Sequence, residues 1–252
     1  MIRPSIIAVL FVVMSFISAC KEKPVAPNEQ PSSPKIELTL EPYFDATPIA
    51  STETIFTTEE GYQLKLREFK IIFTSIKNGN KIVSDAAMYS FENGKSFLKV
   101  DGTSEGLGNL NLSVGVDESL NHSDPSAFPN IHPLNILNAS DMHWSWNPGY
   151  IFFKIEMIAD TLADGITDFN HIVSYHVGKD EAFRNIALTN LNWVNSGTLT
   201  EQLRLKVDFK KILRNGSSIV DIKTESVTHS APDEMPLTLK LATNFQSAIS
   251  PL

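Results

Sequence analysis

From residue 36 onward, the chain is a series of short segments in which apolar and polar residues alternate. Residues 36–40, 62–66 and 110–116 follow this period closely, and side chains of a strand alternate between its two faces. Asn78-Gly79-Asn80 and the glycines between residues 102 and 108 supply turns between such segments. Many short strands separated by Gly and Asn turns predict an all-β fold, an antiparallel β-sandwich with long loops.

Other segments are denser in apolar residues and are expected to form the remaining strands. They cover residues 54–57, 69–76, 82–83, 88–91, 97–100, 150–157, 172–177, 186–188, 203–209 and 219–222. Leu237, Leu241, Phe245 and Ile249 recur at roughly helical spacing, which predicts a short C-terminal helix between residues 234 and 249, packed on the sheets. Residues 210–213 are expected to bend into a short helical turn.

The first twenty residues have the order of a bacterial export signal. Arg3 gives a positive start, residues 6–16 are apolar apart from Ser15, and Ile17-Ser18-Ala19 leads to Cys20, the only cysteine of the chain. The last four of these residues resemble the bacterial lipobox, which implies a signal peptide over residues 1–19 and a lipidated Cys20. A transmembrane anchor is the alternative, but the apolar run is shorter than the roughly 20 residues that span a bilayer.

The segment after the cysteine is expected to be a tether. Residues 20–34 carry four prolines and mostly polar side chains, a composition that forms an extended linker without a core of its own. Lys21, and not Asp, follows the cysteine, so retention at the inner membrane is not indicated. We therefore expect a β domain over residues 35–252 in an outer membrane lipoprotein. Its lipid chains anchor it in the membrane, and it faces the periplasm or the cell surface.

Composition and motifs exclude several classes of function. A net charge of −8, a pI near 5.3 and the absence of any basic run argue against a nucleic-acid partner. A single cysteine and no His-Glu-x-x-His motif leave a structural zinc site without support. No Gly-x-Ser-x-Gly motif or other catalytic constellation is present, so no enzyme activity is expected. Asp117, Glu118 and Asp124 leave calcium as an alternative ligand, although they lack EF-hand spacing.

A long loop and the end of a later strand carry residues suited to a metal site. Residues 117–141 form a long, proline-containing loop with His122, and long loops in compact domains are usually functional. His176 lies near the end of an expected strand, just before Gly178. We predict that these two imidazoles converge beside Trp144 and bind copper, which imidazole nitrogen suits. Each histidine alone is equally compatible with a surface or hydrogen-bonded role.

The residues around Trp144 leave several roles open. His143 is expected to face away from Trp144 in an extended backbone, as a ligand or as a hydrogen-bond donor behind one. Met142 is either a thioether ligand for Cu(I) or a core residue. Trp144 and Trp146 are either oxidisable side chains beside a redox metal or a platform on which sugars stack. Trp146, Met142 and Asp117 are expected to surround the ligands.

These residues carry a family resemblance. The pieces are Gly115-Val116-Asp117, Leu120-Asn121-His122-Ser123-Asp124-Pro125, Pro133-Leu134-Asn135, Met142-His143-Trp144-Ser145-Trp146-Asn147-Pro148-Gly149-Tyr150 and His176-Val177-Gly178. Together they resemble the methanobactin-associated copper-binding proteins, the MbnP-like domain, from about residue 36 to the C-terminus. The Trp-x-Trp-x-x-Gly-Tyr piece is specific in combination with the later His-x-Gly.

The resemblance implies a secreted β-sandwich that binds copper through two histidines and a tryptophan oxidised to kynurenine by a dihaem, peroxidase-like partner. By motif, it implies His122 and His176 as ligands and Trp144, ahead of Trp146, as the oxidised residue. His143 stands where an aromatic or apolar residue is usual, so it either replaces or supplements a ligand. The expected function is copper acquisition, storage or handover. The alternative is an adhesion or glycan-binding lipoprotein that uses both tryptophans as a stacking platform.

Overall fold

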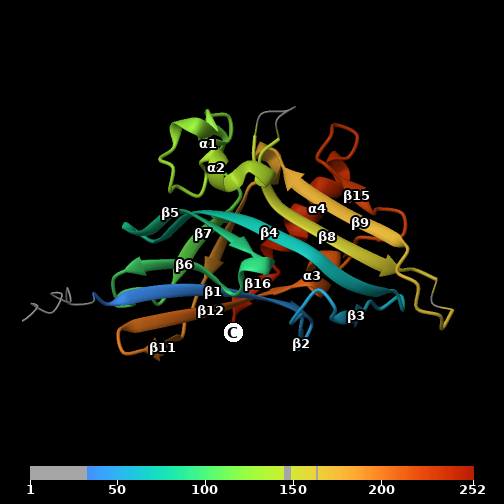
Figure 1. The fold of residues 1–252 in the computed structure, drawn as a ribbon, viewed down its shortest axis with the longest axis horizontal. Helices are drawn as coiled ribbons and strands as arrows, with labels where there is room; N and C mark the ends of the chain where they lie inside the picture. Colours follow the sequence, from blue (N-terminus) through green and yellow to red (C-terminus); the bar gives the residue numbers. More distant parts are fainter. Residues whose placement is uncertain (1–32, 145–148, 163) are drawn as a thin grey trace, which may run out of the picture. The chain divides into compact units, whose positions relative to one another are not determined.

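A computed structural model describes residues 33–144, 149–162 and 164–252, and strands dominate them (Figure 1). One sheet has the order β11 (Trp193–Gly197), β12 (Thr200–Asp208), β1 (Lys35–Phe44), β2 (Thr47–Pro48), with β16 (Ile249–Pro251) also paired to β12 and β6 (Ser96–Asp101) to β1. We call it the first sheet. The segments predicted from their alternating pattern thus form strands.

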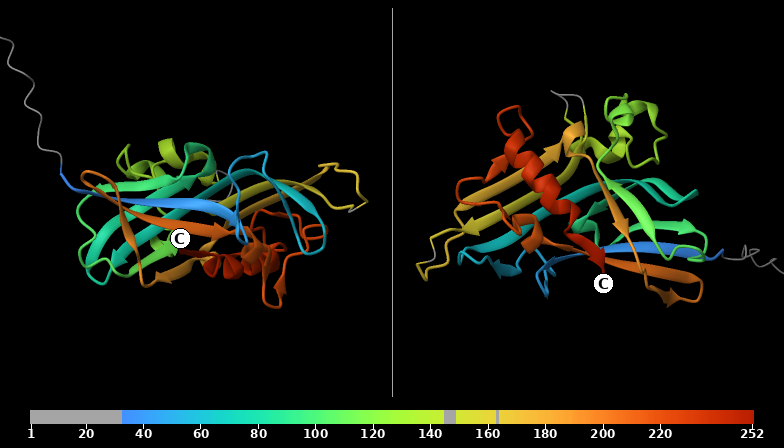
Figure 2. Two further views of the ribbon diagram at one scale, coloured as in Figure 1. Left: turned by 90° about the horizontal axis from the view of Figure 1, so that it is seen from below. Right: turned by 180° about the vertical axis from the view of Figure 1, so that it is seen from behind.

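The second sheet carries the residues of functional interest. Its order is β10 (Arg184–Leu188), β7 (Leu110–Val114), β4 (Gln63–Asn78), β8 (Ile151–Asp160), β9 (His171–Gly178), β15 (Val227–Thr228), with β3 (Ile55–Thr57) and β5 (Lys81–Ser90) also paired to β4. β13 (Arg214–Asn215) and β14 (Ser218–Ile219) form a separate small hairpin. The second sheet curls strongly, as Figure 2 shows from two further sides.

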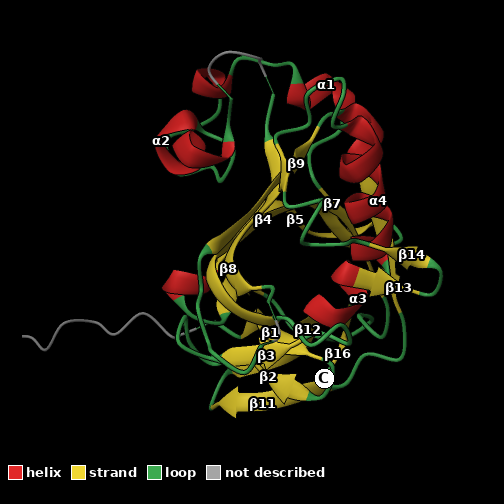
Figure 3. Cartoon of the chain, turned by 90° about the vertical axis from the view of Figure 1, so that its right-hand side faces the viewer, coloured by secondary structure: helices red, strands yellow, loops and turns green. Residues whose placement is uncertain are grey.

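Short helices and one longer helix connect and cover the sheets. They are α1 (Glu118–Asn121), α2 (Ile136–Ala139), α3 (Phe209–Leu213), α4 (Met235–Gln246) and the 3-10 turns Phe91–Asn93, Pro125–Ala127, Ser140–Met142 and Asp180–Ala182. Figure 3 shows α4 on one side of the curved second sheet and α2 on the other. The C-terminal helix and the helical turn after β12 are confirmed, and the long loop contains α1 and α2. No helix within the described ranges is long and apolar enough to cross a bilayer.

The prediction of purely antiparallel sheets was wrong. β1 pairs with β12 in parallel over nine residues, and β15 pairs in parallel with β9. Both sheets therefore contain parallel as well as antiparallel strand pairs. Local alternation predicts which face a side chain occupies, but it does not record whether two segments distant in sequence run in the same direction.

An aromatic core joins the second sheet to α3 and α4. Phe153 of β8 stacks on Phe245 of α4 with ring centroids 4.3 Å apart, and Phe69 of β4 meets Phe209 of α3 edge-on at 5.3 Å. All four rings are fully buried, and burial of each contributes roughly 1.5–3 kcal/mol. The inner face of the sheet is thereby fixed, which leaves its opposite face for polar side chains.

That opposite face is where the candidate site lies. Along β9, Val173, Tyr175 and Val177 are fully buried, so the alternating residues Ser174 and His176 point outward. The prediction that His176 lies at the end of a strand, next to a loop, agrees with this position. Gly178, the last residue of β9, belongs to the same outward series.

We predict that Gly115→Ala destabilises the fold by roughly 3 kcal/mol, through overpacking and left-handed backbone strain. Gly115 has φ +97°, and a Cβ there would lie 2.3 Å from the ring of Phe152. Gly79→Ala is the matched control, because Gly79 also has positive φ (+56°) but open space around it; it should cost about 1 kcal/mol. Urea denaturation measures both, and equal losses would contradict the close approach of Phe152.

Candidate metal centre

Three segments that are distant in sequence meet beyond the end of β9. Asn121, the last residue of α1, accepts a hydrogen bond from the backbone N–H of Tyr150 (2.7 Å) and donates from Nδ2 to Asp180 Oδ1 (2.8 Å). The ring of His122 lies 2.8 Å, through Nε2, from the other oxygen of Asp180. Asp180 follows β9 by two residues. The structure therefore brings together the loop, the start of β8 and the end of β9.

Asp117 orients the loop at this point. It is the N-cap of α1, and its Oδ1 accepts from the backbone N–H groups of Ser119 (3.1 Å) and Leu120 (3.3 Å). A cap of this kind satisfies N–H groups that have no partner within the helix. The helix α1 has only four residues, and His122 follows it directly. The cap at its start therefore also determines the position of His122 at its end.

The indole of Trp144 lies against the end of β9. A Cβ on Gly178 would be 2.6 Å from two atoms of the indole and 2.5 Å from the carbonyl oxygen of Tyr150. Only glycine leaves room for this approach. Trp144 is 5% exposed, and the ammonium of Lys179 lies 5.8 Å from its ring centroid. The ring therefore offers no open face for a sugar. Trp146 lies outside the described residues, as do Cys20, the signal peptide and the tether up to residue 32.

The turn after β9 is strained. Lys179 has φ +78° and ψ +151°, a region that essentially only glycine occupies and that costs of order 1–3 kcal/mol for other residues. This conformation directs the Lys179 side chain over Trp144, while the next residue, Asp180, faces Asn121 and His122. Strain of this kind persists where the surrounding contacts over-determine the backbone.

His176 is held by a carboxylate on the neighbouring strand. Its Nε2 donates to Glu156 Oε1 of β8 at 2.5 Å, and the Ser174 hydroxyl donates to the same oxygen at 2.9 Å. Burial raises the pKa of Glu156, but the hydrogen bonds from His176 and Ser174 lower it by more, so the net pKa lies below its usual value. An ionised carboxylate only accepts, so the proton of the neutral ring is on Nε2 and the lone pair is on Nδ1.

His122 repeats this arrangement. Burial raises the pKa of Asp180, but the hydrogen bonds from His122 and Asn121 bring it below its usual value. Asp180 is therefore also an ionised acceptor for an Nε2–H group. Nδ1 of His122 makes no hydrogen bond within the described part of the chain, and 53% of the side chain is exposed. In its neutral form each of the two predicted ligands would present an Nδ1 lone pair, with its ring oriented by a separate carboxylate.

His143 and Met142 occupy different surroundings. His143 forms an isolated β-bridge with Tyr150, and their rings meet edge-on at 5.0 Å. Its Nε2 is buried without a hydrogen-bond partner among the described residues, and burial lowers the pKa of the ring. A neutral imidazole results, on the Tyr150 side, whereas Trp144 lies on the Gly178 side. Met142 is fully buried and packs in the core.

Sequence reasoning missed several residues of this region. Glu156, Asp180, Lys179 and His229 had no assigned role. The alternation along β8 could have indicated that Glu156 faces outward with His176, but its partner strand was needed to bring them together. Within residues 33–144, 149–162 and 164–252, no three His, Cys, Asp or Glu side chains surround a common point where they could hold a metal ion.

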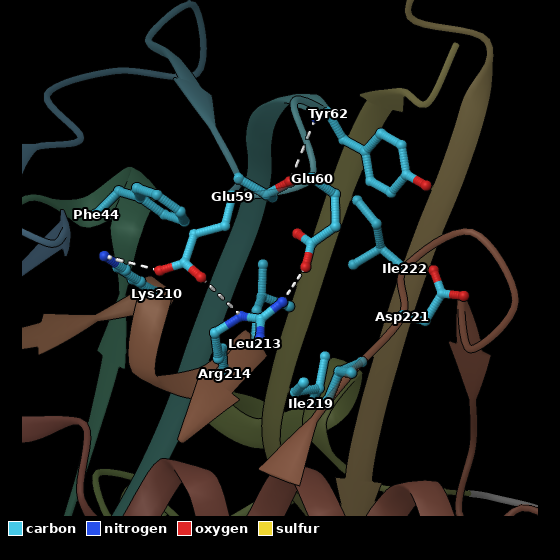
Figure 4. Close-up of a pocket in the computed structure, with 12 residues that line it drawn as sticks. Phe44, Glu59, Glu60, Tyr62, Lys210, Leu213, Arg214, Ile219, Asp221 and Ile222 are labelled. Atoms are coloured by element: carbon cyan, nitrogen blue, oxygen red, sulfur yellow. Dashed lines mark hydrogen bonds and ion pairs between the residues drawn. The ribbon is translucent and has the colours of Figure 1, made fainter. Parts of the chain in front are cut away.

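A cavity of about 290 Å³ lies elsewhere (Figure 4). Four of its charged side chains pair with one another: Glu59 contacts both Lys210 Nζ and Arg214 Nε at 3.3 Å, and Glu60 pairs with Arg214. Its remaining lining is largely apolar, including Phe44. None of the residues predicted to bind metal lines it, so it is not the candidate centre.

Comparisons with known proteins place this chain in a family. A family model described as MbnP matches residues 33–230, so the chain belongs to the MbnP family. Among solved structures, MbnP from Methylosinus trichosporium is similar, with a TM-score of 0.46 and 15% sequence identity over 72% of this chain and 78% of that chain. A search of curated proteins found no match.

We expect Glu156→Gln to lower the free energy of unfolding by about 1–2 kcal/mol at pH 7, because a charged hydrogen-bond acceptor is lost. The pKa of Glu156 is depressed in the folded state. Its contribution is therefore fully present above the usual carboxyl value of about 4.3 and disappears as pH falls through the folded-state value. Urea denaturation at pH 7 and at about pH 3 should show the difference shrinking. Glu105→Gln, at an exposed position, is the control, and a loss independent of pH would contradict the assignment.

Gly178→Ala should displace the indole of Trp144 and destabilise the fold by about 1–3 kcal/mol, the usual cost of overpacking. Gly197→Ala is the control, because no atom lies within 4 Å of the Cβ position at Gly197. Near-ultraviolet circular dichroism and thermal unfolding measure the two effects. An unchanged spectrum in the Gly178 variant would show that Trp144 does not pack there.

Proposed function

We propose that this chain is a copper-binding protein of the cell envelope, in which His122, His176 and Trp144 form the binding region. Cys20 carries the lipid that holds the protein at the outer membrane. The role is acquisition, storage or handover of copper, without turnover. Membership of the MbnP family and the resemblance described above support copper as the bound metal.

One observation carries the proposal: segments up to 59 residues apart in sequence meet at the end of β9. Asp180 contacts His122 at 2.8 Å, while Gly178 receives the indole of Trp144 and lies two residues from His176. The bonds of Asn121 to Tyr150 and Asp180 hold the segments in place.

The donor chemistry fits copper. Neutral imidazole nitrogen is a good ligand for both Cu(I) and Cu(II), and copper leads the divalent affinity order. A carboxylate behind a ligating imidazole fixes its tautomer and raises the basicity of the metal-facing nitrogen. Both His122 and His176 have such a carboxylate. Among the described residues the buried Nε2 of His143 has no hydrogen-bond partner, and burial lowers the pKa of this ring, so His143 is a further candidate donor that either replaces or supplements a ligand.

The resemblance also supports a partner. We propose that a dihaem, peroxidase-like protein oxidises a tryptophan of this region, with Trp144 ahead of Trp146. Glycan stacking remains the alternative function, and the 5% exposure of Trp144 does not favour it. Metal analysis together with intact-mass spectrometry on protein from the native host reports copper content and tryptophan oxidation in one measurement.

We predict that replacing both His122 and His176 by Ala abolishes tight copper binding, because the oriented imidazole nitrogens are removed. His132→Ala is the matched control: His132 also contacts a carboxylate, Asp85, at 3.1 Å, but stacks on Phe128 outside this region. Copper stoichiometry after dialysis against a chelator is the measurement. Stoichiometry equal to wild type in the double variant would refute the proposed function.

A further inference from the structure

His229 lies directly beside His176, although 53 positions separate them in sequence. β15 pairs in parallel with β9, with Val227 opposite Ser174 and Thr228 opposite Tyr175. Continuing this register by one residue places His229 beside His176. Thr228 and Tyr175 are fully buried, so the residue after each points outward. The two imidazole rings accordingly meet with centroids 4.7 Å apart and planes at 86°.

The backbone around His229 is fixed independently of the ring contact. The Ser230 hydroxyl donates to the carbonyl oxygen of His176 and accepts from the N–H of Gly178, both at 3.0 Å. Glu234 accepts from the N–H groups of His229 (2.6 Å) and Ala231 (3.1 Å). These bonds attach the 229–231 segment to the end of β9 and to the start of α4. The position of His229 therefore does not depend on packing between the rings.

The ring nitrogens of this pair are available. His176 uses Nε2 to bind Glu156 and keeps the lone pair of Nδ1. The ring of His229 makes no hydrogen bond within the described residues, and the residue is partly exposed. With metal–nitrogen bonds of about 2.0 Å, two imidazoles on one ion have ring centres roughly 4.5–5.2 Å apart for ligand angles of about 90–110°. The observed 4.7 Å lies within this range.

We propose that His176 and His229 form a two-nitrogen site for a late first-row divalent ion, with Cu²⁺ as the expected ion. Glu156 is a positioning residue for His176. No third His, Cys, Asp or Glu completes a common ligand set within the described ranges, so water fills the remaining coordination positions. This inference rests on the proposed copper function. It adds His229 as the residue whose ring nitrogen binds the same ion as His176.

The test is a Cu²⁺ titration of the full chain against a competing chelator, combined with electron paramagnetic resonance to count coordinating nitrogens. His229→Ala should weaken Cu²⁺ binding at least tenfold and remove one nitrogen from the spectrum. Glu156→Gln should weaken binding about tenfold while leaving the nitrogen count unchanged, as expected when a carboxylate behind a ligand is neutralised.

His171→Ala is the matched control, since His171 begins β9 and binds the carbonyl oxygen of Ile222 at 2.8 Å. It should bind Cu²⁺ as wild type does. A nitrogen count unchanged in His229→Ala overturns the inference, whatever the affinity. If that result accompanies loss of copper in the variant lacking His122 and His176, the proposed function stands without His229. If no variant changes copper binding, the proposed function fails as well.

Discussion

The inward face of β9 is the constraint on which the candidate centre depends. Val173, Tyr175 and Val177 are fully buried, and a shift of one residue would exchange the two faces of the strand. The core therefore determines that His176 points outward. Pairing with β8 then brings Glu156 to it, and parallel pairing with β15 brings His229. Apolar packing on one side of the sheet thus positions polar chemistry on the other.

A buried amide joins the irregular loop to this strand. Asn121 is 2% exposed and uses both ends of its side chain, on the N–H of Tyr150 and on Asp180. Buried polar groups are nearly always hydrogen-bonded, because an unpaired one costs about 1–3 kcal/mol. Displacing α1 would leave these groups without partners. The loop that carries His122 is therefore long and irregular in sequence but fixed where it meets the turn after β9.

Much of the fold followed from local patterns, and the part that did not has a physical reason. Alternation predicted most strands, and the spacing of Leu237, Leu241 and Phe245 predicted α4. Short motifs indicated that His122, Trp144 and His176 belong to one region, and Asp180 and Gly178 connect their surroundings. The sequence could not show that β9 and β15 run in parallel, since β15 has only two residues and no period of its own. Carboxylate partners were equally hidden, because strand register decides which acid faces which histidine.

Within our proposal, the distribution of charge and exposure favours handover of copper over long-term storage. Glu156 and Asp180 are ionised acceptors close to the two predicted ligands, and Lys179 adds one positive charge over Trp144. The sum of these three charges is negative and attracts a cation. The His176 imidazole nevertheless lies on the outward face of the sheet, and the His122 side chain, which follows α1 in the long loop, is 53% exposed. A storage site retains its ion best when the protein encloses it. An ion held by few ligands on an open face can instead be bound by an incoming ligand before its bonds to the histidines break. In our proposal the carboxylates therefore make the histidines better donors, and the open position keeps the ion exchangeable.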